Sequence, residues 1–96
     1  MKNIILKQEA SSRRDDITKA YHSGSIKDYI SSNALSIERN EENDITHIVF
    51  TIGGPFVYLD FEDSPGVVIA KDMDGKSQAA ISLAIWSDIR NILEEL

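Results

Sequence analysis

Residues 47–61 read HIVFTIGGPFVYLDF and contain the strongest local signal in the chain. Large apolar residues recur at every second position on both sides of Gly53-Gly54, a period that is typical of a β-strand with one buried face. Two glycines between two such runs indicate a two-residue hairpin loop. The segment is therefore predicted to form an antiparallel β-hairpin.

The length of the hairpin loop determines which residues pair across it. With a two-residue loop, candidate core residues face one another. These core pairs are Ile48–Leu59, Phe50–Val57 and Ile52–Pro55. The other face then carries the pairs His47–Asp60, Val49–Tyr58 and Thr51–Phe56. A three-residue loop would place Ile48 opposite Asp60, so hydrophobic pattern and turn chemistry agree on the two-residue register.

One further strand is predicted on each side of this hairpin. Leu35 and Ile37 alternate with polar residues ahead of the polar loop 40–44. Behind the hairpin, residues 63–66 (DSPG) predict a turn, with Pro65 at position i+1 and Gly66 at position i+2 as a type II turn requires. Residues 67–71 then form the last strand. The sequence does not decide which side chains of this strand face the core: either Val68 and Ala70, or Val67 and Ile69.

Capping signals predict two short helices before the strands. Ser12 with Asp15 resembles a capping box and would start the first helix. Gly24 would end it in the left-handed conformation, and Ser25 would cap the second helix. Residues 2–10 fit either a strand or a backward extension of the first helix.

A long amphipathic helix is predicted at the C-terminal end, with Ser77 as its N-cap. Its apolar stripe consists of Ile81, Ile85, Ile89, Ile92 and Leu96, widened by Trp86 and Leu93. Such a stripe is typical of a helix that covers one face of a sheet. Leu83 lies outside the stripe and would be either exposed or a contact point.

The expected fold class is α+β, with residues 1–96 as one domain. It comprises an N-terminal helix or two short helices, a four-stranded antiparallel meander, and the C-terminal helix packed on one sheet face. That face carries Ile48, Phe50, Ile52, Val57, Leu59 and Phe61. The second face, with Val49, Phe56 and Tyr58, is covered either by the N-terminal helices or by a partner, and we favour the helices.

Composition excludes several classes of function. The chain has no cysteine, which rules out disulfides, thiolate metal sites and a cysteine nucleophile, and favours a reducing cytoplasm. Its apolar runs are far shorter than a membrane span, and its first residues lack the pattern of a signal peptide. A cytoplasmic protein without membrane contact is expected.

No segment carries a motif for catalysis, cofactor binding or metal binding. Residues 72–75 (DMDG) fail the calcium-loop pattern, because Ser77 and Leu83 stand where glycine and glutamate are required. The Gly53-Gly54-Pro55 segment lacks the lysine and the helix of a phosphate loop. His22 and His47 are the only imidazoles, and no spacing places them together. We therefore expect no enzyme activity, no cofactor and no metal.

Charge is distributed unevenly along the chain, whose formal net charge is −6. Residues 1–34 hold six bases and four acids, a net of +2, and residues 35–96 hold four bases and twelve acids, a net of −8. An acidic surface repels nucleic acid and anionic membranes but attracts basic proteins. Small acidic domains without cysteine include immunity proteins, antitoxins and phage-encoded inhibitors of host nucleases, a likeness of class alone.

The chain is therefore expected to be a protein-binding module. Its expected role is that of a stoichiometric inhibitor of a basic nucleic-acid-handling protein such as a nuclease. It would occupy the partner's site as a nucleic-acid mimic. The alternative is a self-associating accessory domain that uses the second sheet face, and a homodimer is compatible with the sequence. The candidate partner-binding residues are Glu41, Glu42, Asp44, Asp60, Glu62, Asp63, Asp72, Asp74, Phe56, Tyr58 and Trp86.

Overall fold

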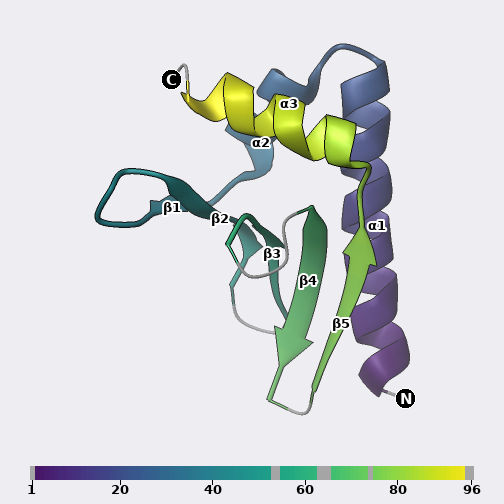
Figure 1. Ribbon diagram of the computed structural model, residues 1–96. Coiled ribbons are helices and arrows are strands. Elements are labelled where there is room, and N and C mark those ends of the chain that lie inside the picture. Colours follow the sequence, from purple (N-terminus) through teal and green to yellow (C-terminus); the bar gives the residue numbers. More distant parts are fainter. Residues whose placement is uncertain (1, 53–54, 63–65, 74, 95–96) are drawn as a thin grey trace.

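A computed structural model describes residues 2–52, 55–62, 66–73 and 75–94, with side chains from residue 5 onward. It contains three helices: α1 (Lys2–His22), α2 (Ile26–Asn33) and α3 (Leu83–Glu94). Its strands are β1 (Ser36–Arg39), β2 (Ile45–Thr51), β3 (Phe56–Asp60), β4 (Val67–Asp72) and β5 (Gly75–Ala80). Each strand pairs antiparallel with its neighbour in sequence, which gives a five-stranded meander (Figure 1).

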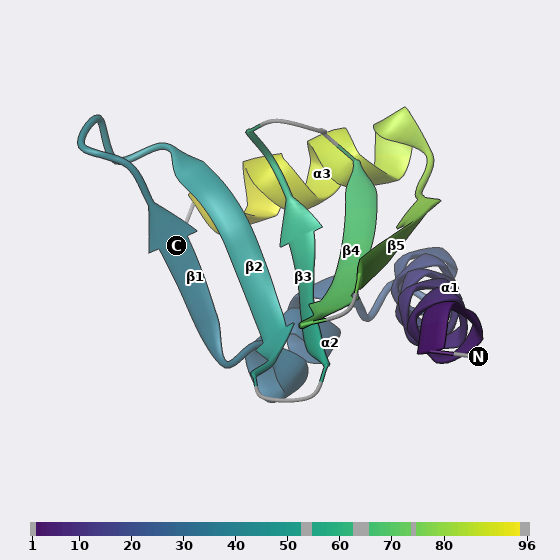
Figure 2. The same cartoon turned by 90° about the horizontal axis from the view of Figure 1, so that it is seen from below.

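Helices α2 and α3 lie on one face of the sheet, and α1 runs beside β5 and β4 (Figures 1 and 2). The fold is thus α+β with the C-terminal helix packed on the sheet, as expected. We call the helix-bearing side the covered face. Its buried strand residues are Ile45, Ile48, Phe50, Val57, Leu59, Val68, Ala70 and Ala79. In Figure 2 the strands lie in front of α2 and α3, and the opposite, open face is turned toward the viewer.

The N-terminal helix is longer than the capping signals predicted. α1 begins at Lys2, so residues 2–10 are helical and Ser12 lies within the helix rather than at its start. Its buried residues are Leu6, Ala10, Ile17 and Ala20. These positions are one stripe at helical spacing in which Arg13 fills the gap. The predicted capping box is therefore wrong, because packing along one continuous stripe outweighs a local N-cap signal.

Arg13 joins α1 to α2 and to β2. Its Nη1 donates a hydrogen bond of 2.8 Å to the Tyr29 hydroxyl, and its guanidinium lies 4.7 Å from the centre of the Phe50 ring. Burial raises the pKa of Tyr29, while the hydrogen bond from Arg13 opposes that rise. A cation in the apolar stripe is thereby satisfied by a hydroxyl and an aromatic face.

The turn between the first two helices follows the prediction at Gly24, whose φ of +75° is the left-handed conformation that glycine adopts readily. Ser25 precedes α2 as predicted, but its hydroxyl makes no capping bond. Instead Ser25 Oγ contacts Ser23 Oγ at 2.7 Å and the Ala20 carbonyl at 3.4 Å.

The β2–β3 register is confirmed near Asp60 and changes toward the loop. His47 pairs with Asp60, Ile48 with Leu59 and Val49 with Tyr58, as predicted. Thr51 then pairs with Val57, because a β-bulge inserts Phe50 as an extra residue. The Phe50 ring faces Arg13 and Tyr29. The centres of the Phe50 and Tyr29 rings are 6.3 Å apart.

This bulge makes three predicted pairs wrong: Phe50–Val57, Thr51–Phe56 and Ile52–Pro55. It also removes Ile52 from the core, where the alternation had placed it, since Ile52 is 72% exposed. Leu35 likewise is exposed and precedes β1 rather than belonging to it. The predicted Gly53-Gly54 turn lies outside the described residues.

The sheet has five strands where four were predicted. Residues 75–80 form β5, and Ser77 pairs with Ala70 instead of capping a helix. Helix α3 begins at Leu83, and Ser82 caps it, accepting a hydrogen bond from Ala84 N at 3.2 Å. Small residues on β5 and β4, such as Ala79 and Ala70, leave room for α1 beside them.

The open questions of strand parity and helix face are settled by this arrangement. Val68 and Ala70 face the covered side, since Val68 pairs with Leu59 and Ala70 with Val57. Ile85, Ile89 and Leu93 of the predicted stripe are buried, and Ile92 and Trp86 are partly buried. Ile81 is buried in the link before α3, Leu83 is exposed, and Leu96 lies outside the described residues.

Candidate functional site

Three rows of side chains run across the strands of the open face. The register places Glu38, His47, Asp60 and Val67 in the first row, Ser36, Val49, Tyr58, Ile69 and Gln78 in the second, and Phe56, Lys71 and Lys76 in the third. No helix lies over these rows in the view of Figure 2. The expectation that the N-terminal helices cover this face is therefore wrong, because α2 packs on the covered face and α1 lies along β5 and β4.

The centre of the open face is an aromatic layer over an aliphatic one. Val49 and Ile69 are only 1% and 4% exposed, although neither belongs to the core formed with the helices. The Tyr58 ring lies 4.9 Å from Phe56 and 5.2 Å from His47, between ring centres. Each of these rings is partly buried. The face therefore shields its own aliphatic residues and presents aromatic edges outward.

Acidic groups surround the imidazole at one end of this face. His47 Nδ1 lies 3.5 Å from Glu38 Oε1, and His47 Nε2 lies 3.7 Å from Asp60 Oδ1. Asp60 is 2% exposed and accepts a hydrogen bond of 2.9 Å from the Glu62 amide. Of the two carboxylates, Glu38 alone is an exposed charge.

Basic groups occupy the diagonally opposite end. Lys71 Nζ lies 5.3 Å from the centre of the Phe56 ring and 5.5 Å from that of Tyr58. Lys76 pairs with Lys71 across β4 and β5, and both side chains are exposed. The open face thus has an acidic corner at Glu38 and a basic corner at Lys71 and Lys76.

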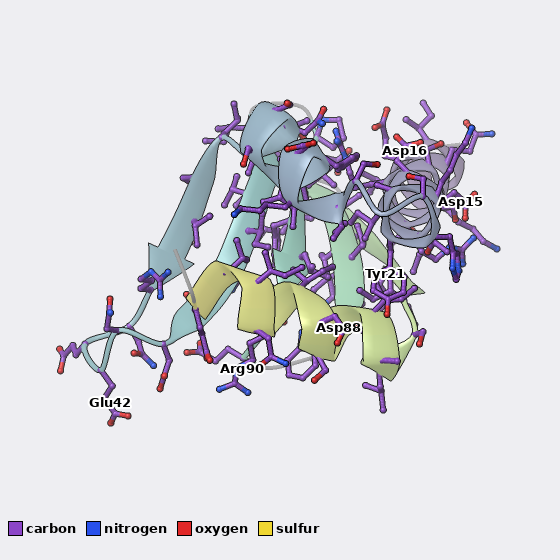
Figure 3. All side chains as sticks on the ribbon, turned by 90° about the horizontal axis from the view of Figure 1, so that it is seen from above. Asp15, Asp16, Tyr21, Glu42, Asp88 and Arg90 are labelled. Atoms are coloured by element: carbon purple, nitrogen blue, oxygen red, sulfur yellow. The ribbon has the colours of Figure 1, made fainter. Side chains whose placement is uncertain are left out.

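The connection between β1 and β2 projects from the body and carries three of the eight predicted acidic residues (Figures 1 and 3). We call residues 38–44 the acidic hairpin. Asn40 Oδ1 accepts hydrogen bonds from the amides of Glu42 and Asp44, at 2.9 and 3.0 Å. Asn43 adopts a left-handed φ of 68°, which asparagine tolerates better than most residues. These contacts set the shape of the loop through its backbone.

Three carboxylates of the acidic hairpin, those of Glu41, Glu42 and Asp44, have no basic partner in the described part of the chain. Arg39 is the one base within it, and its Nη1 and Nη2 donate to the carbonyls of Asn43 and Leu93, at 3.0 and 3.4 Å. Glu41, Glu42 and Asp44 are exposed and form no ion pair within the described part of the chain. Glu42 lies at the tip in Figure 3.

The remaining predicted acids are divided between the two ends of the sheet. Glu62 follows β3 and is exposed at the end from which the acidic hairpin projects. Asp72 lies at the other end, where its Oδ1 accepts a hydrogen bond of 3.1 Å from Gly75 N. Asp63 and Asp74 lie outside the described residues. The structure therefore brings Glu62 toward the acidic hairpin and keeps Asp72 away from it.

The three predicted aromatic anchors do not form one patch. Phe56 and Tyr58 lie on the open face, whereas Trp86 belongs to α3 and packs on Phe61, at 5.5 Å between ring centres. Arg90 lies over the Trp86 ring at 5.9 Å. The indole Nε1 is buried and has no hydrogen-bond partner among the described residues.

Two residues of the open face were missed as site residues. The predicted site included neither Glu38 nor Lys71. Placing Val68 and Ala70 in the core would have put Lys71 beside Phe56. The parity of β4 was thus the missing signal.

The described ranges contain neither a metal-binding group nor a membrane-spanning helix. No group of three or more His, Asp or Glu side chains there could hold a metal ion. None of the helices in those ranges combines the length and the apolar character needed to cross a bilayer. Searches of family models, curated proteins and solved structures return no match. The acidic hairpin and the open face are therefore the features of the described residues that bear on function.

Proposed function

We propose that the protein is a stoichiometric, protein-binding inhibitor that uses the acidic hairpin to occupy a basic surface on a nucleic-acid-handling protein. The observation that carries this proposal is the set of three exposed carboxylates on Glu41, Glu42 and Asp44, held on a shaped loop without ion pairs in the described part of the chain. Like charges held this close repel one another, and a cationic partner relieves that repulsion.

A surface built for phosphates suits such a hairpin. Phosphate-binding grooves hold clustered Lys and Arg side chains, and a fixed row of carboxylates presents the same sign of charge to them. The loop is ordered by Asn40 and Arg39 before any partner binds, so little conformational entropy is lost on association. The rim of charge accelerates encounter, and the effect weakens with salt.

Apolar contacts beside the hairpin would supply the lasting affinity. Trp86 and Phe61 lie on the covered side near the end of β3, and Arg39 connects the hairpin to the Leu93 carbonyl of α3. Glu62 adds a further exposed carboxylate at this end. In this arrangement the acids steer the partner and Trp86 anchors it.

The first test identifies a partner and measures how fast it binds. The immobilised protein captures proteins from a cytoplasmic lysate at low and high salt, and the captured protein is purified. Its association rate with the wild-type chain is then compared with that of the variant Glu41→Gln, Glu42→Gln, Asp44→Asn. We expect the variant to associate about tenfold more slowly at low salt, and short duplex DNA or RNA to compete with binding.

A matched control removes the same charge from another surface. The substitutions Glu9→Gln, Asp15→Asn and Asp16→Asn on α1 change three exposed carboxylates far from the hairpin. This control should bind at the wild-type rate. A partner whose association rate ignores both salt and the hairpin substitutions would show that the acids serve only solubility.

A further inference from the structure

The exposed charges of the open face are complementary to those of a second open face turned the opposite way. Its acidic corner is Glu38 on β1, beside His47, and its basic corner is Lys71 and Lys76 on β4 and β5. Tyr58 lies between the two corners on the central strand. The exposed charges of the face therefore differ in sign along one diagonal.

The two lysines of the basic corner lie side by side on the open face. Lys71 and Lys76 are direct cross-strand partners, a placement that disfavours like charges. Neither forms an ion pair within the residues that the structure describes. Lys71 instead lies over the Phe56 and Tyr58 rings, where it remains exposed. A carboxylate brought from outside would neutralise this corner.

A second copy of the chain brings such a carboxylate by symmetry. Consider two copies stacked with their open faces toward each other and related by a two-fold axis that lies in the plane between them. The axis passes over Tyr58 and follows the other diagonal of the face, which crosses the line from the acidic to the basic corner. Strands lie about 4.8 Å apart and same-face residues about 6.7 Å apart along a strand. On that grid the axis places Lys71 and Lys76 of one copy beside Glu38 and His47 of the other, and the same contact occurs twice.

The resulting arrangement is one that sheets are known to adopt. A diagonal axis turns the strands of the two copies to near right angles, which is the orthogonal class of sheet packing. The Tyr58 rings meet close to the axis, and the Phe56 ring of each copy falls over the Val49 region of the other. A half-buried aromatic centre with charges at its rim is typical of homodimer interfaces.

We propose that the open face binds a second copy of this chain, with Glu38 of each copy paired with the basic corner of the other. Glu41, Glu42 and Asp44 lie outside the three rows of this face, so the proposal does not depend on the inhibitor function. In the dimer Glu38 is engaged, whereas Glu41, Glu42 and Asp44 of both copies stay free at the periphery.

Charge reversal tests the pairing with the full chain. Sedimentation velocity over a wide range of protein concentration gives the dimer dissociation constant of the wild type at low and high salt. Glu38→Lys alone and Lys71→Glu alone each turn two attractive contacts into repulsive ones. We expect each to raise the dissociation constant about tenfold or more. The control Lys27→Glu, on the exposed side of α2, should leave it unchanged.

The double variant separates a contact between copies from an effect within one copy. Glu38 and Lys71 lie on β1 and β4, with two strands between them, so they do not touch in one chain. Glu38→Lys with Lys71→Glu should therefore restore dimerisation. An equimolar mixture of the two single variants should also form a mixed dimer more tightly than either forms its own.

Two results would overturn the proposal. One is a wild-type chain that stays monomeric at every concentration and salt tested, which would leave the face to a different protein. The other is a dimer whose dissociation constant ignores the single reversals or is not rescued by the double one. Circular dichroism of each variant establishes that the fold is intact before its association is interpreted.

Discussion

The two faces of the sheet come from the same strands and differ in what buries their side chains. On the covered face, Ile48, Leu59 and Val68 form a continuous aliphatic row that α3 and its neighbours close. On the open face, Val49 and Ile69 are equally buried, but by the rings of the sheet itself and not by a helix. Burial of side chains on the covered face stabilises the packing of the helices on the sheet. The aromatic and charged residues of the open face do not contribute to that packing.

The largest expected effect contrasts two isoleucines near each other in sequence. Ile48→Ala should lower the free energy of unfolding by about 2–5 kcal/mol, because Ile48 is fully buried against the helices. Ile52→Ala should change it by about 0.5 kcal/mol or less, since Ile52 is exposed beyond the bulge. Urea titration measures both. Equal losses would mean that the bulge does not turn Ile52 out of the core.

The next effect concerns the polar row of the open face. Asp60→Ala should cost about 1–3 kcal/mol, because it removes the acceptor of the Glu62 amide and a neighbour of His47. A double-mutant cycle with His47→Ala should show a coupling of at least about 0.5 kcal/mol. Glu62→Ala, an exposed acid two residues on, is the control. Additive losses would show that the two side chains do not interact.

A smaller effect tests the helical layer that distinguishes the covered face. The Tyr21 hydroxyl of α1 donates a hydrogen bond to the Asp88 carboxylate of α3 (Figure 3). This hydrogen bond, together with the negative charge of Asp88, raises the pKa of Tyr21 above its ordinary value of 10.0. The folded state thus favours the protonated phenol.

The sign of the pH dependence follows from that direction. The stabilisation is complete below pH 10.0 and is lost as pH rises through the higher pKa of the folded state. The wild type should therefore exceed Tyr21→Phe in stability at neutral pH, and the difference should shrink at strongly alkaline pH. Chemical denaturation of both proteins across this range checks the trend. A difference that does not vary with pH would contradict the hydrogen bond.

The smallest effect belongs to the acidic hairpin, which is part of neither buried layer. Replacing Glu41, Glu42 and Asp44 by their amides should leave the free energy of unfolding within about 0.5 kcal/mol of the wild type. Thermal and urea unfolding of the triple variant measure this. A loss above about 1 kcal/mol would mean that the carboxylates stabilise the fold, and would weaken the case that they serve a partner.

Hydrophobic alternation predicted those parts of the sheet in which one face is aliphatic. It placed Ile48 opposite Leu59 and His47 opposite Asp60, because a shift by one residue would have buried a carboxylate among isoleucines. It did not predict the bulge at Phe50, whose ring contacts Arg13 and Tyr29, two residues from helices distant in sequence. Long-range contacts of this kind leave no local pattern.

Two elements were misassigned because tertiary packing overrode local signals. β5 reads GKSQAA, without β-branched or aromatic residues, and its small side chains serve the approach of α1. Its Ser77 imitates an N-cap. α1 has a weak apolar stripe, since a cation occupies one of its central positions. Of the candidate site, the acids of the hairpin were predictable from composition, but their separation from Asp72 required the strand order.

The packing of α1 beside β5 has a consequence for how the protein is made. Neighbouring strands of the meander can pair as soon as they are synthesised, because each contacts the one before it. α1 is translated before all five strands, and the strands beside which it lies, β4 and β5, are the last of the five. A helix of this length with so few apolar residues is marginal on its own in water. The nascent chain therefore holds α1 without its main packing surface until β4 and β5 leave the ribosome, and arrest of translation before β5 would leave that surface incomplete.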